Sequence, residues 1–110
     1  MTAETPVLDT LAEVTAASIA HNSLAPRELM LARMAALIAV DAPAASYLAT
    51  GGAAADSGVT AEDIQGVMIA VAPVVGTARV VSAGGKILRA LDVAVAVADS
   101  DIADDGAARQ

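Results

Sequence analysis

The spacing of apolar residues along the chain predicts five helices. The first runs from Pro6 to Ala20, with apolar side chains recurring every three or four residues. The second begins at Pro26 and is apolar on nearly all sides. Because such a helix is buried over most of its surface, we expect a second copy of the chain to cover part of it.

The third helix is predicted to start after Asp41, which can act as its N-terminal cap with Pro43 in the first turn. It runs to about Asp56 and has Gly51 and Gly52 in its middle. Each glycine weakens a helix by about 1 kcal/mol relative to alanine. We therefore expect another backbone to approach closely at this pair.

Gly58 is expected to close the third helix. Thr60 then caps the fourth, with Asp63 in the first turn, where the helix dipole favours negative charge. Pro73 should kink or end this helix, and Gly76 makes the turn that follows.

The last helix is predicted to run from Thr77 to about Asp99. It contains a second glycine pair, Gly84 and Gly85, which we interpret as another point of close contact.

Residues 91–99 alternate branched and small side chains, which also suits a strand. No second convincing strand exists to pair with them, so we favour helix. Residues 100–110 are acidic and small, which is typical of a flexible tail. The sequence thus predicts an all-α domain at 1–99, followed by this tail.

Composition limits how much core the chain can build. Alanine makes up 29 of the 110 residues, and Tyr47 is the single aromatic residue. Small side chains gain little burial energy, so partner subunits are expected to supply the rest. The net charge is −7 and the basic residues are scattered, which argues against nucleic-acid binding because that needs a basic stripe.

The chain contains no cysteine, which excludes disulfides, thiolate metal sites and thiol redox chemistry. The N-terminal segment has acidic residues and no basic one, unlike a secretory signal. Every apolar run ends well before the ~18 residues that a membrane-spanning helix needs. These features predict a cytoplasmic protein without a membrane span.

Three short segments, in this order and spacing, resemble the carboxymuconolactone decarboxylase family, which includes alkylhydroperoxidase-type disulfide reductases. They are Pro-Arg-Glu-Leu at 26–29 with Arg33, Gly-Val-Thr-Ala-Glu-Asp-Ile at 58–64, and Ala-Pro-Val-Val-Gly at 72–76 with Arg79. The resemblance implies an all-helical fold, assembly into homotrimers or homohexamers, and pockets between subunits.

The redox branch of that family carries a CxxC motif and a histidine at the start of the third helix. Counting forward from the second helix places these positions on Val40, Pro43 and Tyr47, and counting back from Gly58 places them on Pro43, Ser46 and Thr50. Neither register contains cysteine or histidine. Ser46 has no nearby base in the sequence to activate its hydroxyl, so we reject peroxidase or disulfide reductase activity.

Two residues are candidates for acid–base chemistry. The resemblance implicates Glu28 in proton relay, although an acid in a first helical turn is also ordinary. His21 is the one side chain with an ordinary pKa near neutrality, but its place at a helix C-terminus is a sufficient structural reason for it.

Four further residues are candidate ligand contacts. Arg33 and Arg79 could each hold an anion or pair with an acid on another helix, and Tyr47 could line a pocket or fill an interface. Ser46 is the fourth candidate. One histidine with scattered acids lacks metal-ligand spacing, so we expect neither a metal site nor a cofactor.

These observations support three hypotheses of different classes. The preferred one is an oligomeric, non-redox relative of this family that binds a small organic acid or apolar molecule between subunits or serves assembly. The second is a thiol-independent decarboxylase-type lyase or an isomerase, with Glu28 or His21 as acid/base and Arg33 or Arg79 holding a carboxylate. The third is a subunit whose apolar helix docks on another protein.

Overall fold

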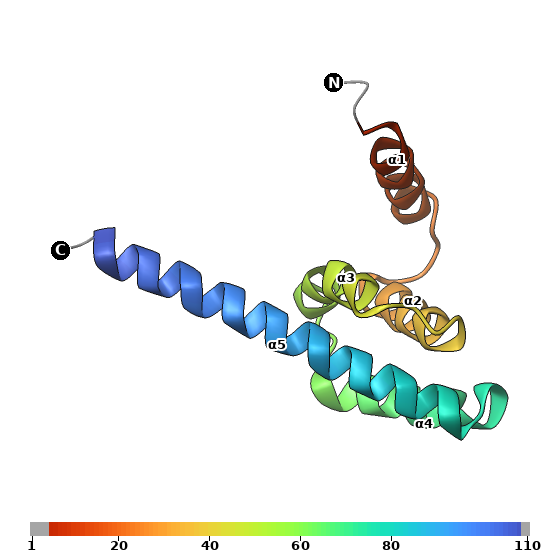
Figure 1. Ribbon diagram of the computed structural model, residues 1–110. Coiled ribbons are helices and arrows are strands. Elements are labelled where there is room, and N and C mark those ends of the chain that lie inside the picture. Colours follow the sequence, from red (N-terminus) through yellow and green to blue (C-terminus); the bar gives the residue numbers. More distant parts are fainter. Residues whose placement is uncertain (1–4, 109–110) are drawn as a thin grey trace.

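The computed structural model describes residues 5–108, with side chains up to residue 100, and this part of the chain is helical without strands. Five helices follow one another, as Figure 1 shows. They are α1 (Pro6–Ala20), α2 (Pro26–Ala39), α3 (Ala44–Asp56), α4 (Ala61–Val75) and α5 (Thr77–Ala108). None of these helices is both long enough and apolar enough to cross a membrane. The predicted all-α class is therefore confirmed.

The predicted bounds of α1 and the predicted start of α2 are confirmed, whereas α3 begins later than expected. Pro43 occupies its N-cap position, and Ala44 is its first helical residue. The prediction that Asp41 caps α3 is wrong, because Asp41 belongs to the C-terminal turn of α2. A proline at the N-cap brings no side-chain acceptor, and α3 accordingly has no side-chain cap.

The start of α4 agrees with the sequence. The Thr60 hydroxyl accepts a hydrogen bond from the Asp63 amide, and the Asp63 carboxylate accepts one from the Thr60 amide, which makes a capping box. Pro73 lies inside α4 and does not end it, because the helix continues to Val75. Gly76 makes the predicted turn with a positive φ of 91°.

Helix α5 extends past the predicted end near Asp99 and reaches Ala108. The helical reading of 91–99 is confirmed, since these residues lie inside it. The side chains of 101–110 and the backbone of 109–110 lie outside the described residues, so the flexibility of the acidic tail stays a prediction.

The close contacts predicted at the two glycine pairs are present at one position only. A β-carbon placed on Gly51 or Gly52 would meet no atom within 4 Å, so no backbone approaches α3 there and that prediction is wrong. The same holds for Gly85. At Gly84 the β-carbon would lie 3.3 Å from the terminal methyl of Met68, so here α5 does pack closely on α4, against a side chain.

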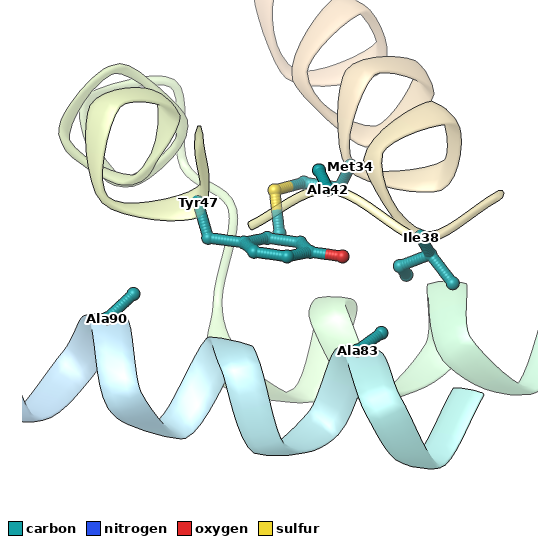
Figure 2. Close-up of a cluster of buried hydrophobic side chains, with 6 residues drawn as sticks. All are labelled: Met34, Ile38, Ala42, Tyr47, Ala83 and Ala90. Carbon is teal, nitrogen blue, oxygen red and sulfur yellow. The ribbon is translucent and has the colours of Figure 1, made fainter. Parts of the chain in front are cut away.

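The core lies where α2, α3 and α4 meet the first half of α5. Its main cluster is shown in Figure 2 and consists of Met34, Ile38, Ala42, Tyr47, Ala83 and Ala90. A second cluster, of Leu29, Met30, Ala54 and Val59, joins α2 to the end of α3. Helices α3, α4 and α5 of the same chain cover the face of α2 that carries Leu29, Met34 and Ile38, whereas Val40 at its end is exposed. The expected contact of α2 with another copy stays a prediction.

Two parts of the chain lie away from this core. Helix α1 packs against no other described helix and has no buried residue. Helix α5 is exposed at every position from Leu91 to Ser100, beyond its last buried residue, Ala90. Figure 1 shows α1 standing apart and the C-terminal half of α5 projecting from the bundle.

Candidate functional site

The most connected group of polar side chains surrounds the turn that ends α2. Asp41 adopts a left-handed backbone conformation there, with φ of 56°. Its amide donates to the Ile38 carbonyl at 3.2 Å, and the Ala42 amide donates to the Leu37 carbonyl at 3.0 Å. This pair of bonds is a Schellman motif, which usually has glycine at the left-handed position. Aspartate tolerates that conformation better than most residues do, but at a cost in conformational energy.

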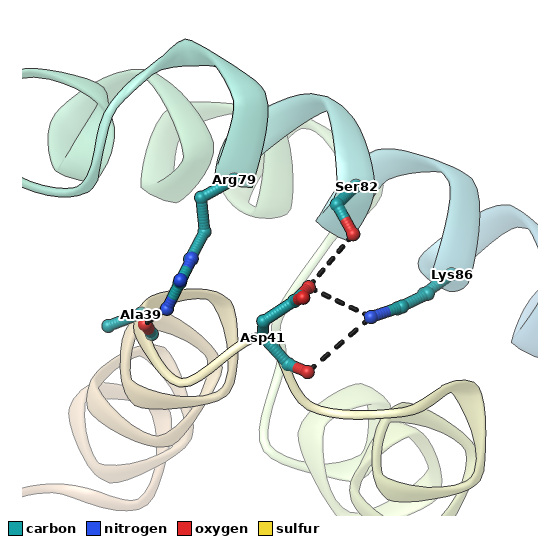
Figure 3. A network of polar contacts seen from close by, with 5 residues as sticks. All are labelled: Ala39, Asp41, Arg79, Ser82 and Lys86. Atoms are coloured by element: carbon teal, nitrogen blue, oxygen red, sulfur yellow. Dashed lines mark hydrogen bonds and ion pairs between the residues drawn. The ribbon is translucent and has the colours of Figure 1, made fainter.

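The Asp41 side chain joins this turn to α5, as Figure 3 shows. Its Oδ1 accepts hydrogen bonds from the Ser82 hydroxyl and from Lys86 Nζ, each at 2.8 Å. Lys86 Nζ also lies 3.4 Å from the Asp41 backbone carbonyl. The bonds from Lys86 and then Ser82 lower the pKa of the Asp41 carboxyl below its ordinary value. Asp41 is therefore an ionised tether between two elements.

Arg79 extends this group by one helical turn. Its Nη1 donates to the Ala39 carbonyl at 2.6 Å, at the C-terminus of α2, where the helix dipole favours a cation. Arg79, Ser82 and Lys86 are spaced three and four residues apart, so they lie on one face of α5. Arg79 thus holds a helix end through a backbone carbonyl, and not the acid on another helix that was considered as its structural partner.

The network does not form an activated nucleophile. A serine needs a neighbouring base to accept its proton, and lysine can serve only when it is neutral. Lys86 here forms an ion pair with Asp41, and the Ser82 hydroxyl donates to the same carboxylate. Both partners thus stabilise the charged form of Asp41, which favours a structural role.

Tyr47 is buried in the main core cluster, with 3 % of its surface exposed. Figure 2 shows its ring between α3 and α5 with Met34 against it. Its hydroxyl has no hydrogen-bond partner, although the oxygen is shielded from solvent. Burial, with a smaller effect from the charge of Asp41, raises the pKa of the Tyr47 phenol above its ordinary value. Tyr47 therefore fills the core of its own chain.

The structure separates the remaining candidates. Glu28 is exposed in the first turn of α2, whereas Arg79 contacts the last residue of that helix. Eleven residues of helix place these two positions about 16 Å apart along the axis. Arg33 Nη2 donates to the Ser18 hydroxyl of α1 at 3.1 Å, and His21 is exposed at the C-cap of α1. Acid–base and anion-binding candidates thus do not converge.

Both possible registers of the reactive motif fall around the start of α3, but the side chains there differ in burial. Val40 is exposed, Ser46 and Thr50 are half-buried, and Tyr47 is buried. Pro43 ends the connection, and its carbonyl accepts a hydrogen bond from the Ser46 amide at 3.0 Å. No candidate at these positions has a charged neighbour that could activate it in the described contacts.

Two open hollows on the surface are apolar and contain none of the candidates. One lies on α1 and is lined by Pro6, Val7, Thr10 and Leu11. The other is lined by Gln65, Met68, Ile69, Ala72 and Val80 of α4 and α5. In the part of the chain that the structure describes, no three acidic or histidine side chains gather as metal ligands.

Sequence reasoning missed Ser82 and Lys86 and assigned Asp41 to the wrong helix. The sequence does contain a signal for this pair, because Ser82 and Lys86 are four residues apart and therefore lie on the same face of a helix. The partner of that pair is a loop residue 41 and 45 positions away, respectively, and nothing local in the sequence specifies this pairing.

Comparison with protein-family models, with curated proteins and with solved structures finds no match to this chain. The function therefore has to be argued from the geometry of the chain itself.

Proposed function

We propose that this chain is a homo-oligomeric, non-redox helical protein in which contacts between copies complete the burial that one chain leaves unfinished. The kinship with the carboxymuconolactone decarboxylase family is part of this proposal. It has the support of the three sequence segments and of an all-helical chain without cysteine.

The amount of exposed surface carries the proposal. The chain exposes 7464 Å², whereas a folded monomer of 10.8 kDa is expected to expose about 5,500 Å². Its radius of gyration is 16.2 Å, compared with about 13 Å for a globular domain of 110 residues. The excess, about 1,900 Å², exceeds the ~800 Å² per partner that a standard stable interface buries.

Much of this surface is apolar. Large apolar side chains with more than half of their surface exposed include Val7, Leu8, Leu11, Val14 and Ile19 of α1. On α5 the same holds for Val81, Leu88, Leu91, Val95 and Val97. Exposed apolar side chains mark protein–protein contact sites in soluble proteins when they form a contiguous patch. On α1, Val7, Leu11 and Val14 lie on one side of the helix, as such a patch requires. The two apolar hollows described above are open to solvent and do not enclose a small molecule. An assembly role therefore has more support than a ligand-binding role.

No observation in the structure supports the lyase or isomerase hypothesis. It requires Glu28 or His21 to share a cavity with Arg33 or Arg79. The guanidinium groups of these arginines are instead bound to Ser18 and to the Ala39 carbonyl, and neither described hollow includes Glu28 or His21.

Sedimentation velocity and native mass spectrometry of the purified chain at micromolar concentration test the proposal. We expect a single discrete oligomer, with partial dissociation on dilution. A well-folded monomer throughout that concentration range would refute the proposal. Association only with a different protein, with the isolated chain monomeric, would instead favour the hypothesis of a partner-binding subunit.

A further inference from the structure

Helix α1 has one apolar face that nothing in its own chain covers. Val7, Leu11 and Val14 are spaced four and three residues apart, so they lie on the same side of the helix. Their exposed fractions are 70 %, 56 % and 61 %. The acidic residues Asp9 and Glu13 fall on the opposite side. An isolated helix of 15 residues is marginal in water, so its stability depends on packing this face.

Helix α5 has a matching deficit beyond Ala90, in what we call the projecting segment, residues 91–108. Between Leu91 and Ala98 the only charged residue is Asp92. The exposed Leu91, Val93, Val95 and Val97 alternate along the chain and so spread over more than half of the helix circumference. A helix that is apolar over so much of its surface is normally enclosed by other helices.

From these two faces we infer that α1 of one copy packs along the projecting segment of α5 in a second copy. This inference rests on the proposed function and names the surfaces that carry it. Within one chain the two helices make no contact. Figure 1 shows them on different sides of the bundle. A contact only between projecting segments would leave α1 uncovered, and a contact only between α1 helices would leave the projecting segment uncovered. Pairing α1 with the projecting segment covers both surfaces with one kind of contact.

The dimensions of the two helices agree with this pairing. At 1.5 Å per residue, Val7 to Val14 on α1 and Leu91 to Ala98 on the projecting segment each span about 10 Å. These two apolar stretches can therefore lie against one another, with the acidic residues from Asp99 onward beyond the contact. Each copy gives one α1 and receives one, so a discrete oligomer requires that these contacts close into a ring of two or more copies. The excess of exposed surface is large enough for two such contacts per chain.

Because the chain has no cysteine, single cysteines can report this contact directly. We would prepare Leu11→Cys on α1 and Leu91→Cys on the projecting segment as separate proteins. Each is then mixed alone or with the other and oxidised. Since each chain carries one cysteine, any disulfide must join two copies. We expect covalent dimers in the mixture and little in either single protein, because a disulfide needs α-carbons within about 7 Å.

The matched control is Glu13→Cys, on the opposite side of α1, which should not form a disulfide with Leu91→Cys. Neighbouring positions, Val7 and Val14 against Val95, cover a shift in register along the helices. If oligomers form but only Leu91→Cys joins to itself, the pairing of α1 with α5 is overturned while the proposed oligomer stands. If every protein stays monomeric, both are overturned.

A second measurement does not depend on disulfide geometry. Leu11→Lys should weaken association by at least about tenfold, since it removes a buried leucine from the contact. Glu13→Lys introduces the same side chain on the polar side and should leave association unchanged. Leu11 contacts no other described helix, so circular dichroism of both variants should match the parent. Equal association of the two variants would contradict the inferred contact.

Discussion

The hydroxyl of Tyr47 makes the burial of this core directly testable. The oxygen is shielded from solvent and has no hydrogen-bond partner, while the ring packs with Met34, Ile38 and Ala42. The substitution Tyr47→Phe removes that oxygen and keeps the ring. Leaving a buried polar group unpaired costs about 1–3 kcal/mol, so we expect the free energy of unfolding to rise by about 1 kcal/mol or more.

Chemical denaturation followed by circular dichroism measures this difference, with the protein concentration held fixed because association adds to apparent stability. In a domain of about 100 residues, 1 kcal/mol moves the midpoint of thermal unfolding by about 4–8 °C. Tyr47→Leu is the matched control, since it removes the hydroxyl and the ring together. It should lower stability by about 2–4 kcal/mol, the usual cost of truncating a large core side chain.

The pH dependence gives an independent check. The pKa of the Tyr47 phenol is raised in the folded protein, so the folded state holds this proton more tightly than the unfolded chain. Its contribution to stability is therefore complete below the unfolded pKa of about 10 and is lost as pH rises above it. Tyr47→Phe should reduce the alkaline loss. If Tyr47→Phe instead lowers stability, the hydroxyl has a partner in solution, and our account of it as an unpaired group is refuted.

Three further predictions concern the stability of the helices and of their ends. Gly51→Ala should stabilise the chain by about 0.5–1 kcal/mol, because the glycine is helical with open space around it. Gly58→Ala should destabilise the chain, because Gly58 has a φ of 86° that alanine disfavours. Equal effects of the two substitutions in urea denaturation would contradict this assignment. Thr60→Ala should cost about 1 kcal/mol by removing the capping hydroxyl, and the exposed Thr15→Ala, measured identically, is its control. The stability that Asp41 gains from Lys86 is present above its ordinary pKa and lost as pH falls below it; Asp41→Asn should flatten this acid loss, and an unchanged acid profile would count against the tether.

Local chemistry was sufficient to predict much of the helical order. Pro6 and Pro26 each occupy a first helical position, and Thr60 with Asp63 forms the expected capping box. At Gly58 the amide donates to the Ala55 carbonyl and the next amide donates to the Ala54 carbonyl, which closes α3 as predicted. These features involve residues within a few positions of one another, so the sequence displays them directly.

The predictions that failed depend on contacts between distant residues. Aspartate is a common N-cap residue, but the backbone of Asp41 ends α2 and its carboxylate pairs with Lys86 of α5. Gly51 and Gly52 suggested a close approach, but no neighbouring helix reaches them. For the candidate site, Tyr47 was expected to line a pocket or fill an interface, but its side chain is buried in the core of its own chain.

The position of the unburied apolar surface changes the argument for assembly. An apolar α2 first suggested that copies meet there, although α3, α4 and α5 of its own chain already bury its largest apolar side chains. Exposed apolar side chains lie elsewhere as well: on α1, on α4 at Ile69 and Val74, and along α5. Helices α2 to α4 and the first half of α5 hold the buried residues of the core, such as Met34, Ile38 and Tyr47. In the proposed assembly, contacts between copies bury aliphatic side chains that this core leaves exposed on α1 and on the projecting segment, such as Leu11 and Leu91.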